Sequence, residues 1–397
     1  RGGLFPKVDL RGETGYEYLD SPSTRNRTTR GPGKSRYTSL WRNSASVFVT
    51  QMIFDGFQTV NLVRSARARA VQAGHRIANT RQTVALEAIA AYLDVVRTRE
   101  FVRLARRNVR AHAGILGGIV RLQRQGRTTR ADIGQARARY FQATARLKSF
   151  QGELRRAIVR YQAVVGRTPS ARIKQPGMAV LRPRYARMTL QQAYKVADKQ
   201  NPENKAAQSE VKARRYALDA TKGLFTPRVD LEVEGSLGNN LDGSRGHSAN
   251  LTALIVLTWN LYRGGSDIAR RREALANLTV SQYDAADSRR VVRQRLGQAY
   301  EAFATDRATI PDNINRVRSN RGLVGAYARQ FLAGQRSLLD RLDVQNDLFL
   351  AELELANNRS RLFFNYFSFV AATGELLPYF GLRKDIAAKK SKRGGAG

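Results

Sequence analysis

Two stretches of the chain alternate strictly between apolar and polar positions. In residues 8–18 and again in residues 229–237, carboxylates occupy one side and apolar side chains the other. A period of two predicts β-strands with one wet face, and Tyr16 and Tyr18 would suit the aromatic belt of a membrane barrel. An amphipathic hairpin packed on a soluble core is the alternative interpretation. In a barrel, the carboxylates of the wet face would line the lumen: Asp9, Glu13, Glu17, Asp230, Glu232 and Glu234.

Helical periodicity follows each strand pair, whose second strands are expected at residues 45–54 and 251–261. Residues 57–125 contain no proline, and their apolar side chains recur every three to four positions, which predicts one long helix. A return helix of about half that length is expected at residues 131–165, and a further helix at 190–222 that Asn201 and Pro202 could recap. The second half predicts helices at 268–333 and 338–372, with Pro311 expected to interrupt and bend the first of them.

The chain contains an internal repeat. The segment Gly126-Arg-Thr-Thr-Arg-Ala-Asp132 returns 208 residues later as Gly334 through Asp340, and Phe141 and Phe349 share this offset. A repeat of this length determines the architecture, so we interpret it before assigning individual elements. The repeat favours one fused unit over two or three separate domains. The expected order is a first strand pair 4–54, helices 57–166, an equatorial link 167–189, a short helix 190–222, a second strand pair 224–262, helices 266–373 and an equatorial segment with a basic tail 374–397.

Four strands cannot close a barrel, and an open amphipathic sheet cannot sit in lipid. Three copies with four strands each would give a 12-stranded barrel, an even number suited to an outer membrane. The short helix at 190–222 complements the return helix of the first half, whereas the second half lacks such a complement. We therefore expect a helix of roughly 30 residues and a signal peptide upstream of Arg1.

The composition limits the kinds of functional site that we expect in this chain. The chain has no cysteine and three widely spaced histidines, so no metal site and no cofactor are predicted. No catalytic triad, phosphate-binding loop or GxGxxG motif is present, which argues against an enzyme. The net charge of +37 supports a different class as an alternative, a basic coiled-coil protein that binds nucleic acid. That alternative leaves the strand pairs unexplained. Residues 383–393 are interpreted as a basic extension.

Three motifs carry a resemblance to a known family. The chain is similar to the TolC family of outer-membrane efflux and export proteins in Gly223-Leu-Phe-Thr-Pro-Arg-Val-Asp-Leu231, Trp259-Asn-Leu-Tyr-Arg-Gly-Gly265 and Ala333-Gly-Gln-Arg-Ser-Leu-Leu-Asp-Arg-Leu-Asp343. The third motif, with the residues up to Phe349, is most similar to members that serve type I protein secretion.

The resemblance implies an α+β membrane protein: a homotrimer with a 12-stranded outer-membrane β-barrel and a long periplasmic α-helical barrel. It implies a passive exit duct that contacts a periplasmic adaptor (membrane fusion) protein and an inner-membrane ABC transporter. The outer-membrane channel of a multidrug efflux pump, driven by a proton-dependent transporter, is the near alternative. The family's tunnels are typically acidic, so the high positive charge does not match this pattern.

The resemblance also assigns roles to residues of the two repeated turns, which would form the periplasmic tip. Asp340 and Asp343 match an inward ring of carboxylates, which would attract and bind cations. A solvated helix face neutralised by Arg336 and Arg341 is the alternative. Asp132, Arg336 and Phe331 match positions that restrain the closed tip, although Phe331 lacks the hydroxyl found there in the family. The tip turns and adaptor-docking positions are Gly126, Arg127, Thr128, Gly334, Gln335, Ser337 and Leu338.

Overall fold

The computed structural model describes residues 2–22, 37–171 and 173–382. The chain forms two compact units, one made of residues 1–72 and 207–285 and the other of residues 73–206 and 286–397. Each unit contains segments of both sequence repeats, so neither repeat forms a unit by itself. The predicted basic tail and most of the first strand-pair loop lie outside the described residues.

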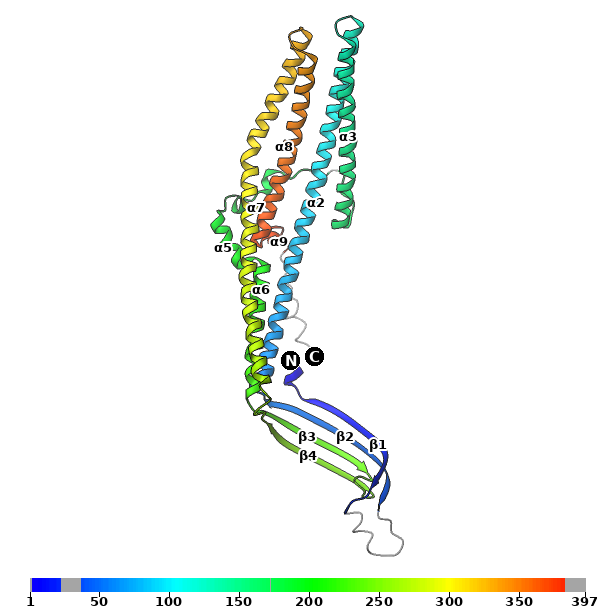
Figure 1. The fold of residues 1–397 in the computed structure, drawn as a ribbon, viewed down its shortest axis with the longest axis vertical. Helices are drawn as coiled ribbons and strands as arrows, with labels where there is room; N and C mark the ends of the chain where they lie inside the picture. The colour runs from blue at the N-terminus through cyan, green and yellow to red at the C-terminus, as the bar shows by residue number, and fades with distance from the viewer. Residues whose placement is uncertain (1, 23–36, 172, 383–397) are drawn as a thin grey trace. The chain divides into compact units, whose positions relative to one another are not determined.

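The first unit contains a four-stranded antiparallel sheet (Figure 1). Its strands are β1 (Lys7–Leu19), β2 (Thr38–Phe54), β3 (Arg228–Asn239) and β4 (His247–Thr258), and the short η1 (Gly2–Leu4) precedes β1. The strands lie in sequence order, so β1 and β4 form the two edges. The central pairing of β2 with β3 joins the two repeats.

Strand boundaries differ from the expected ones in several places, and β4 ends at Thr258 instead of residue 261. β2 begins at Thr38 instead of residue 45, because residues 38–44, most of them polar, pair with β1. β3 and β4 continue up to a tight turn at residues 240–246, in which Asn240 and Asp242 adopt positive φ angles of 58° and 51°. Ladder hydrogen bonds to a neighbouring strand therefore outweigh weak intrinsic strand propensity at these positions.

The helices reproduce the sequence repeat residue by residue. Helices α2 (Gln58–Arg124) and α7 (Ser266–Leu332) each have 67 residues, and α3 (Arg130–Val165) and α8 (Leu338–Thr373) each have 36. All four boundaries of α7 and α8 follow those of α2 and α3 by the same 208 positions. Helix α7 continues on both sides of Pro311, so the expected interruption is wrong.

The segment between the repeats forms short elements: η2 (Met178–Val180), α4 (Pro183–Ala186), α5 (Leu190–Gln200), α6 (Pro202–Ala220) and η3 (Thr221–Phe225). The chain expected to form one helix at 190–222 divides at Asn201. The Asn201 side chain accepts a hydrogen bond from the backbone N–H of Glu203 at 2.8 Å, as an N-cap does, and Pro202 occupies the first helical position.

The largest apolar core lies in the second unit around the C-terminal half of α8. Fully buried Tyr366 and Phe369 pack with residues of α5, α7 and α9 (Leu376–Tyr379). The Tyr366 hydroxyl accepts a hydrogen bond from the backbone N–H of Arg182 at 2.9 Å. Among the described residues, no helix has both the length and the apolar character needed to cross a membrane.

Candidate functional site at the two helix turns

The α2–α3 and α7–α8 turns share one backbone conformation. Gly126 and Gly334 adopt left-handed φ angles of 71° and 77°. Each of these glycines and the residue after it donate the same pair of backbone hydrogen bonds to the end of the preceding helix. The outer bond of the pair runs from Arg127 N to Leu122 O in one turn and from Gln335 N to Gln330 O in the other, both at 2.9 Å. This is the Schellman ending of a helix, in which glycine avoids the strain of a positive φ.

A capping box begins the return helix in each repeat. Thr129 and Ser337 are the N-caps. The carboxylates of Asp132 and Asp340 accept hydrogen bonds from the backbone N–H groups of these N-caps at 3.0 and 3.3 Å. The hydroxyl groups of Thr128 and Thr129 and the Thr129 backbone N–H lower the pKa of Asp132. The spacing Thr129-x-x-Asp132 and Ser337-x-x-Asp340 could have predicted these caps from the sequence.

A small apolar cluster next to the turns connects the α2–α3 helix pair to the α7–α8 helix pair. Ile115 and Ile119 of α2 pack against Leu338 and Leu342 of α8, with Phe331 at the side of the cluster. Leu338 is buried, so it supports the turn from below. Leu338 is the one buried side chain among the residues predicted for the tip turns and adaptor docking.

Arg139 of α3 forms an ion pair with Asp343, one of the two carboxylates predicted to form the ring. Its guanidinium lies 2.8 Å from Asp343, and the two side chains are 33% and 50% exposed. The arginines expected to neutralise this face have other contacts. Arg336 lies 4.3 Å over the ring of Tyr327, and Arg341 lies 5.4 Å over the ring of Phe331. Sequence reasoning missed Arg139 because its distance along the chain from Asp343 gives no hint of contact.

Asp132 and Arg336, which match restraining positions, do not contact each other within the described chain. Asp132 is held by Thr128 and Thr129, and Arg336 donates to Gln330 at 3.3 Å. The structure therefore places both residues at the turns without an ion pair between them.

His112 of α2 lies close to the Arg139–Asp343 pair. Its side chain is 3% exposed, and its Nδ1 atom has no hydrogen-bond partner among the described residues. Burial lowers the pKa of His112, and the positive charge of Arg139 lowers it further. The imidazole is therefore neutral at neutral pH.

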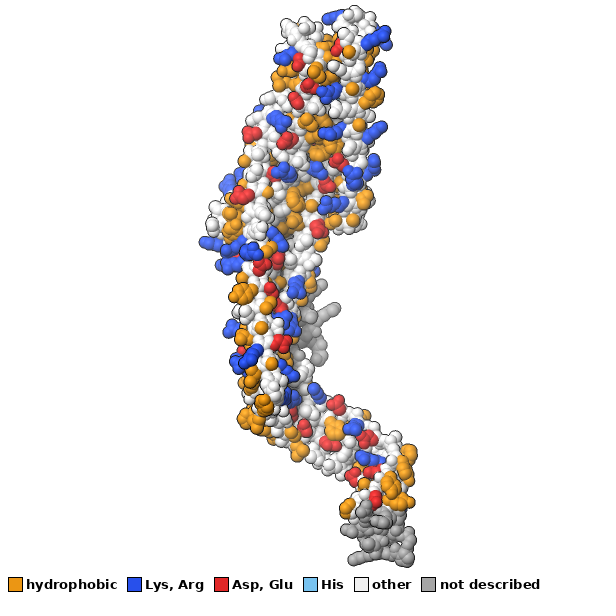
Figure 2. All heavy atoms as spheres, viewed as in Figure 1, with side chains coloured by type: hydrophobic (Ala, Val, Ile, Leu, Met, Phe, Trp, Pro, Cys, Tyr) orange, Lys and Arg blue, Asp and Glu red, His pale blue; other side chains and the backbone are white. Residues whose placement is uncertain are grey.

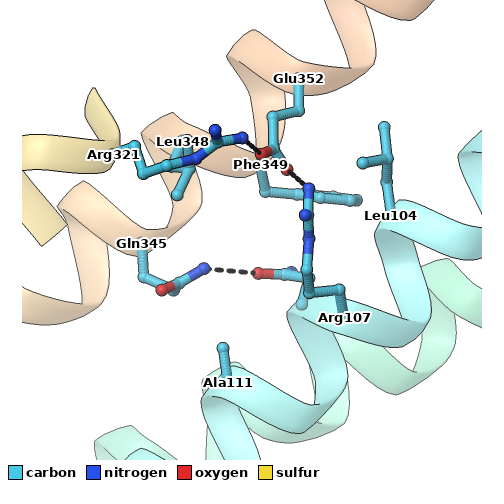
Figure 3. A pocket seen from close by; sticks show the side chains of 9 residues that line it. Leu104, Arg107, Ala111, Arg321, Gln345, Leu348, Phe349 and Glu352 are labelled. Atoms are coloured by element: carbon cyan, nitrogen blue, oxygen red, sulfur yellow. Dashed lines mark hydrogen bonds and ion pairs between the residues drawn. The ribbon is translucent and has the colours of Figure 1, made fainter. Parts of the chain in front are cut away.

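Glu352 of α8 forms a buried polar contact between the α2–α3 and α7–α8 helix pairs. Its carboxylate is 9% exposed and accepts hydrogen bonds from Arg107 of α2 and, at 2.9 Å, from Arg321 of α7 (Figure 3). These residues line a pocket of about 180 Å³ together with Gln345, Leu348 and Phe349. Burial of one carboxylate between two guanidinium groups satisfies its charge. Sequence reasoning did not identify this site, because its members come from three helices.

The sheet brings all six predicted lumen carboxylates to one face. Directly opposed residues of an antiparallel pair point to the same side, and the register pairs Asp9 with Phe48, Phe48 with Glu234, and Thr50 with Glu232. Ion pairs on this face join Glu13 to Arg11 at 2.6 Å and Asp230 to Arg228 at 2.6 Å. The opposite face is apolar and exposed. Its side chains include Val8, Leu10, Tyr16, Trp41, Leu237, Leu251 and Ile255.

Most basic side chains of the described chain lie on the helices. Figure 2 shows Lys and Arg side chains distributed along the helical surface, mixed with fewer acidic ones. The described strands contribute only Lys7, Arg11, Arg42 and Arg228.

Comparisons with known proteins agree with this architecture. Residues 1–167 and 193–375 match the family model described as outer membrane efflux protein. The chain is 26% identical over 335 residues to the outer membrane efflux protein BepC of Brucella suis, covering 84% of this chain and 72% of BepC. It is 25% identical over 367 residues to the alkaline protease secretion protein AprF of Pseudomonas aeruginosa, covering 90% and 74%. The crystal structure of the outer membrane protein VceC from Vibrio cholerae has the same fold, with a TM-score of 0.77, 14% identity and coverage of 94% and 88%. The expected TolC-like fold of four antiparallel strands and long helices is confirmed.

Proposed function

Because this chain belongs to the outer membrane efflux protein family, we propose that three copies of it form one continuous exit duct for type I protein secretion. The chain is an outer-membrane channel of the TolC family that extends into the periplasm, and it is a transport protein without enzymatic activity. The family membership leaves the nucleic-acid-binding alternative without support.

The main support for a trimer comes from the open four-stranded sheet. Its edge strands β1 and β4 have unpaired backbone groups on one side, and its apolar face is bare, with Leu10 78% and Leu251 79% exposed. Neither feature is stable alone in lipid or in water. Pairing β1 of one copy with β4 of the next satisfies both edges, and closure by three copies places the apolar face toward lipid and the carboxylates toward the lumen.

Substitutions on opposite faces of one strand test this arrangement. Leu10→Glu places a charge on the lipid side and should prevent recovery of trimer from detergent-extracted outer membranes. Arg11→Glu changes the charge of the adjacent residue, which points to the other face, and should leave trimer recovery intact. Equal losses in both variants, or a monomer in wild-type extracts, would contradict the barrel.

Type I secretion with a periplasmic adaptor and an ABC transporter is supported by the likeness to AprF, an alkaline protease secretion protein that aligns over 90% of this chain. The likeness to BepC, an efflux protein, supports multidrug efflux with a proton-driven pump as the second candidate. Deletion of the gene separates them. Loss of a secreted protein with unchanged dye accumulation favours secretion, and dye accumulation with normal secretion favours efflux.

The turns would form the closable periplasmic end of this duct. In a trimer, Asp340 and Asp343 of each copy would surround the aperture and favour cations, while Asp132, Arg336 and Phe331 would restrain it. Single-channel recording of a variant with Asp340→Ala and Asp343→Ala tests this role. We expect lower cation selectivity and weaker block by multivalent cations. Unchanged values would remove the ring from the proposal.

A further inference from the structure

The pocket around Glu352 combines charged and apolar side chains. Its volume is about 180 Å³, and its lining residues come from α2, α7 and α8 within the second unit. Arg107 and Arg321 extend toward Glu352 from two different helices (Figure 3). The apolar part of the lining consists of Leu104, Ala111, Leu348 and Phe349. An apolar cavity of about 150 Å³ can hold benzene, so this pocket has room for a small organic molecule.

The charges that line this pocket do not balance. Two guanidinium groups contact one carboxylate, and no second carboxylate lines the pocket in the described part of the chain. The Nη2 atom of Arg321 lies 2.9 Å from one Glu352 oxygen, and the Nη2 atom of Arg107 donates to the other. Each guanidinium carries five N–H donors, so donors remain on both arginines. The pocket therefore has one net positive charge and free hydrogen-bond donors.

Asn108 adds a buried amide to the same lining. Its side chain is 6% exposed, and its Oδ1 atom accepts a hydrogen bond from Gln345 Nε2 at 3.5 Å. Its Nδ2 group donates to no residue that the structure describes. Buried polar groups of folded proteins normally have a hydrogen-bond partner. An acceptor inside the pocket, such as a carboxylate oxygen, would supply that partner.

The internal repeat shows that a helix pair of this kind folds without these charges. The positions of the other repeat that are equivalent to the two arginines and the glutamate are uncharged: Asn315, Ala113 and Thr144. Buried ion clusters are often no more stabilising than apolar residues of similar volume. Binding of a ligand therefore accounts for charges that the backbone fold does not need.

We propose that this pocket binds a small organic carboxylate. The anionic group of the ligand accepts hydrogen bonds from Arg107, Arg321 and Asn108, because planar guanidinium groups match the geometry of a carboxylate. Its apolar part packs against Leu348 and Phe349, which an inorganic anion would leave uncovered. All of these residues belong to one chain, so the site does not depend on the proposed duct.

The charged end of the pocket is accessible within the chain. The side chains of Arg107 and Arg321 are 45% and 62% exposed, whereas Glu352 between them is 9% exposed. A ligand can therefore reach the two guanidinium groups without breaking their bonds to Glu352. Once bound, it would add contacts to both helix pairs and raise the thermal stability of the protein.

The test measures binding of benzoate to the purified full-length protein in detergent by isothermal titration calorimetry, at neutral pH and constant ionic strength. Benzamide, which has nearly the same shape without the charge, should bind at least about tenfold more weakly. The variant R321Q should weaken benzoate binding by about tenfold or more, while Arg107 still pairs with Glu352. The matched control is R316Q. Arg316 also lies on α7 and pairs with a glutamate of α8, Glu354, at 3.1 Å, but it does not line the pocket, so its loss should change binding by less than about twofold.

A second variant tests the space instead of the charge. A111L fills part of the pocket from α2 and retains both arginines and Glu352. It should also weaken benzoate binding by about tenfold or more, because the larger side chain occupies the volume of the ligand. This variant keeps the test decisive if R321Q is unstable, and circular dichroism checks the helical content of all three variants.

Four results would overturn the proposal. Absence of benzoate binding to the wild-type protein would exclude this ligand class. Equal binding of benzoate and benzamide would exclude recognition of the negative charge. Equal losses in R321Q and R316Q would mean that benzoate binds to arginines anywhere on the helices. Unchanged binding in A111L would place the bound benzoate outside this pocket.

Discussion

The return helices of the two repeats have the same length and the same caps but different surroundings. Helix α8 buries seventeen residues on all sides, whereas α3 buries five, four of them seven residues apart from Ala136 to Ala157. Phe349 on α8 is 4% exposed, and its repeat equivalent on α3, Phe141, is 60% exposed. Duplication thus copied the backbone, and the two copies then acquired different side-chain environments.

This difference between α3 and α8 identifies an apolar surface that a single chain leaves exposed. A seven-residue spacing is the narrow seam of a coiled coil, by which α3 packs on the rest of its unit. The remaining sides of α3 carry exposed apolar residues such as Phe141 and Val159. In the proposed trimer, this bare flank would meet the neighbouring copy. Helix α8, by contrast, forms its contacts within its own chain.

The strongest test of this contrast replaces the equivalent phenylalanines. Phe349→Ala should lower the free energy of unfolding by about 3–5 kcal/mol, because it opens a cavity in the cluster that joins α2, α3 and α8. Phe141→Ala should leave the helical fold intact and instead weaken the association of subunits. Chemical denaturation followed by circular dichroism measures the first effect, and trimer dissociation in detergent the second.

Similar losses in both measurements for the two variants would contradict the contrast. They would mean that α3 and α8 occupy equivalent environments in the assembled protein.

The glycines that end the two return helices provide a second matched pair. Gly166 and Gly374 have φ angles of 76° and 87°, so alanine should cost about 1–2 kcal/mol at either position. A Cβ atom at Gly374 would also lie 2.7 Å from the Asn201 Cα atom, whereas one at Gly166 meets nothing within 4 Å. Gly374→Ala should therefore lower the thermal unfolding temperature more than Gly166→Ala. An equal effect would show that the approach of Asn201 to α8 is not maintained in solution.

Low pH should reduce the stability of the α2–α3 helix pair through His112. Its folded-state pKa is lowered, so the unfolded chain binds a proton more readily. Its contribution to stability is therefore constant above pH of about 6.5 and declines as the pH falls below that value. Replacement by asparagine, the residue at the equivalent position 320, should reduce the loss of thermal stability on acidification. An unchanged pH dependence in His112→Asn would place the responsible group elsewhere.

The smallest expected change in stability is that of Arg139→Gln. The Arg139–Asp343 pair is partly exposed and should contribute less than about 1 kcal/mol. Its removal frees the charge of Asp343, so cation selectivity in single-channel recordings should rise. Arg146→Gln, an exposed substitution two helical turns further along α3, is the control. Equal cation selectivity in the two variants would mean that Arg139 does not influence the charge at the aperture.

Much of the fold could be predicted because its determinants are local or repeated. The strand alternation correctly assigned the carboxylates to one face, and the repeat gave the lengths of α2, α3, α7 and α8 to within a few residues. The break at Asn201 followed from N-cap chemistry. Pro311 was misread, because tertiary packing maintains a helix that local propensity would break. The polar start of β2 was missed for the same reason, since its ladder partner lies on another strand.

The sequence alone therefore determined the duplication, the faces of the strands and the ends of the helices, since each depends on residues near one another in the chain. Only the tertiary structure decided that Arg139 meets Asp343, that Arg107 and Arg321 share Glu352, and that Phe349 is buried while Phe141 is not. These contacts depend on the rotation and axial position of each helix against its neighbours. A change of one residue in that register turns a side chain by about 100°, which local periodicity does not determine.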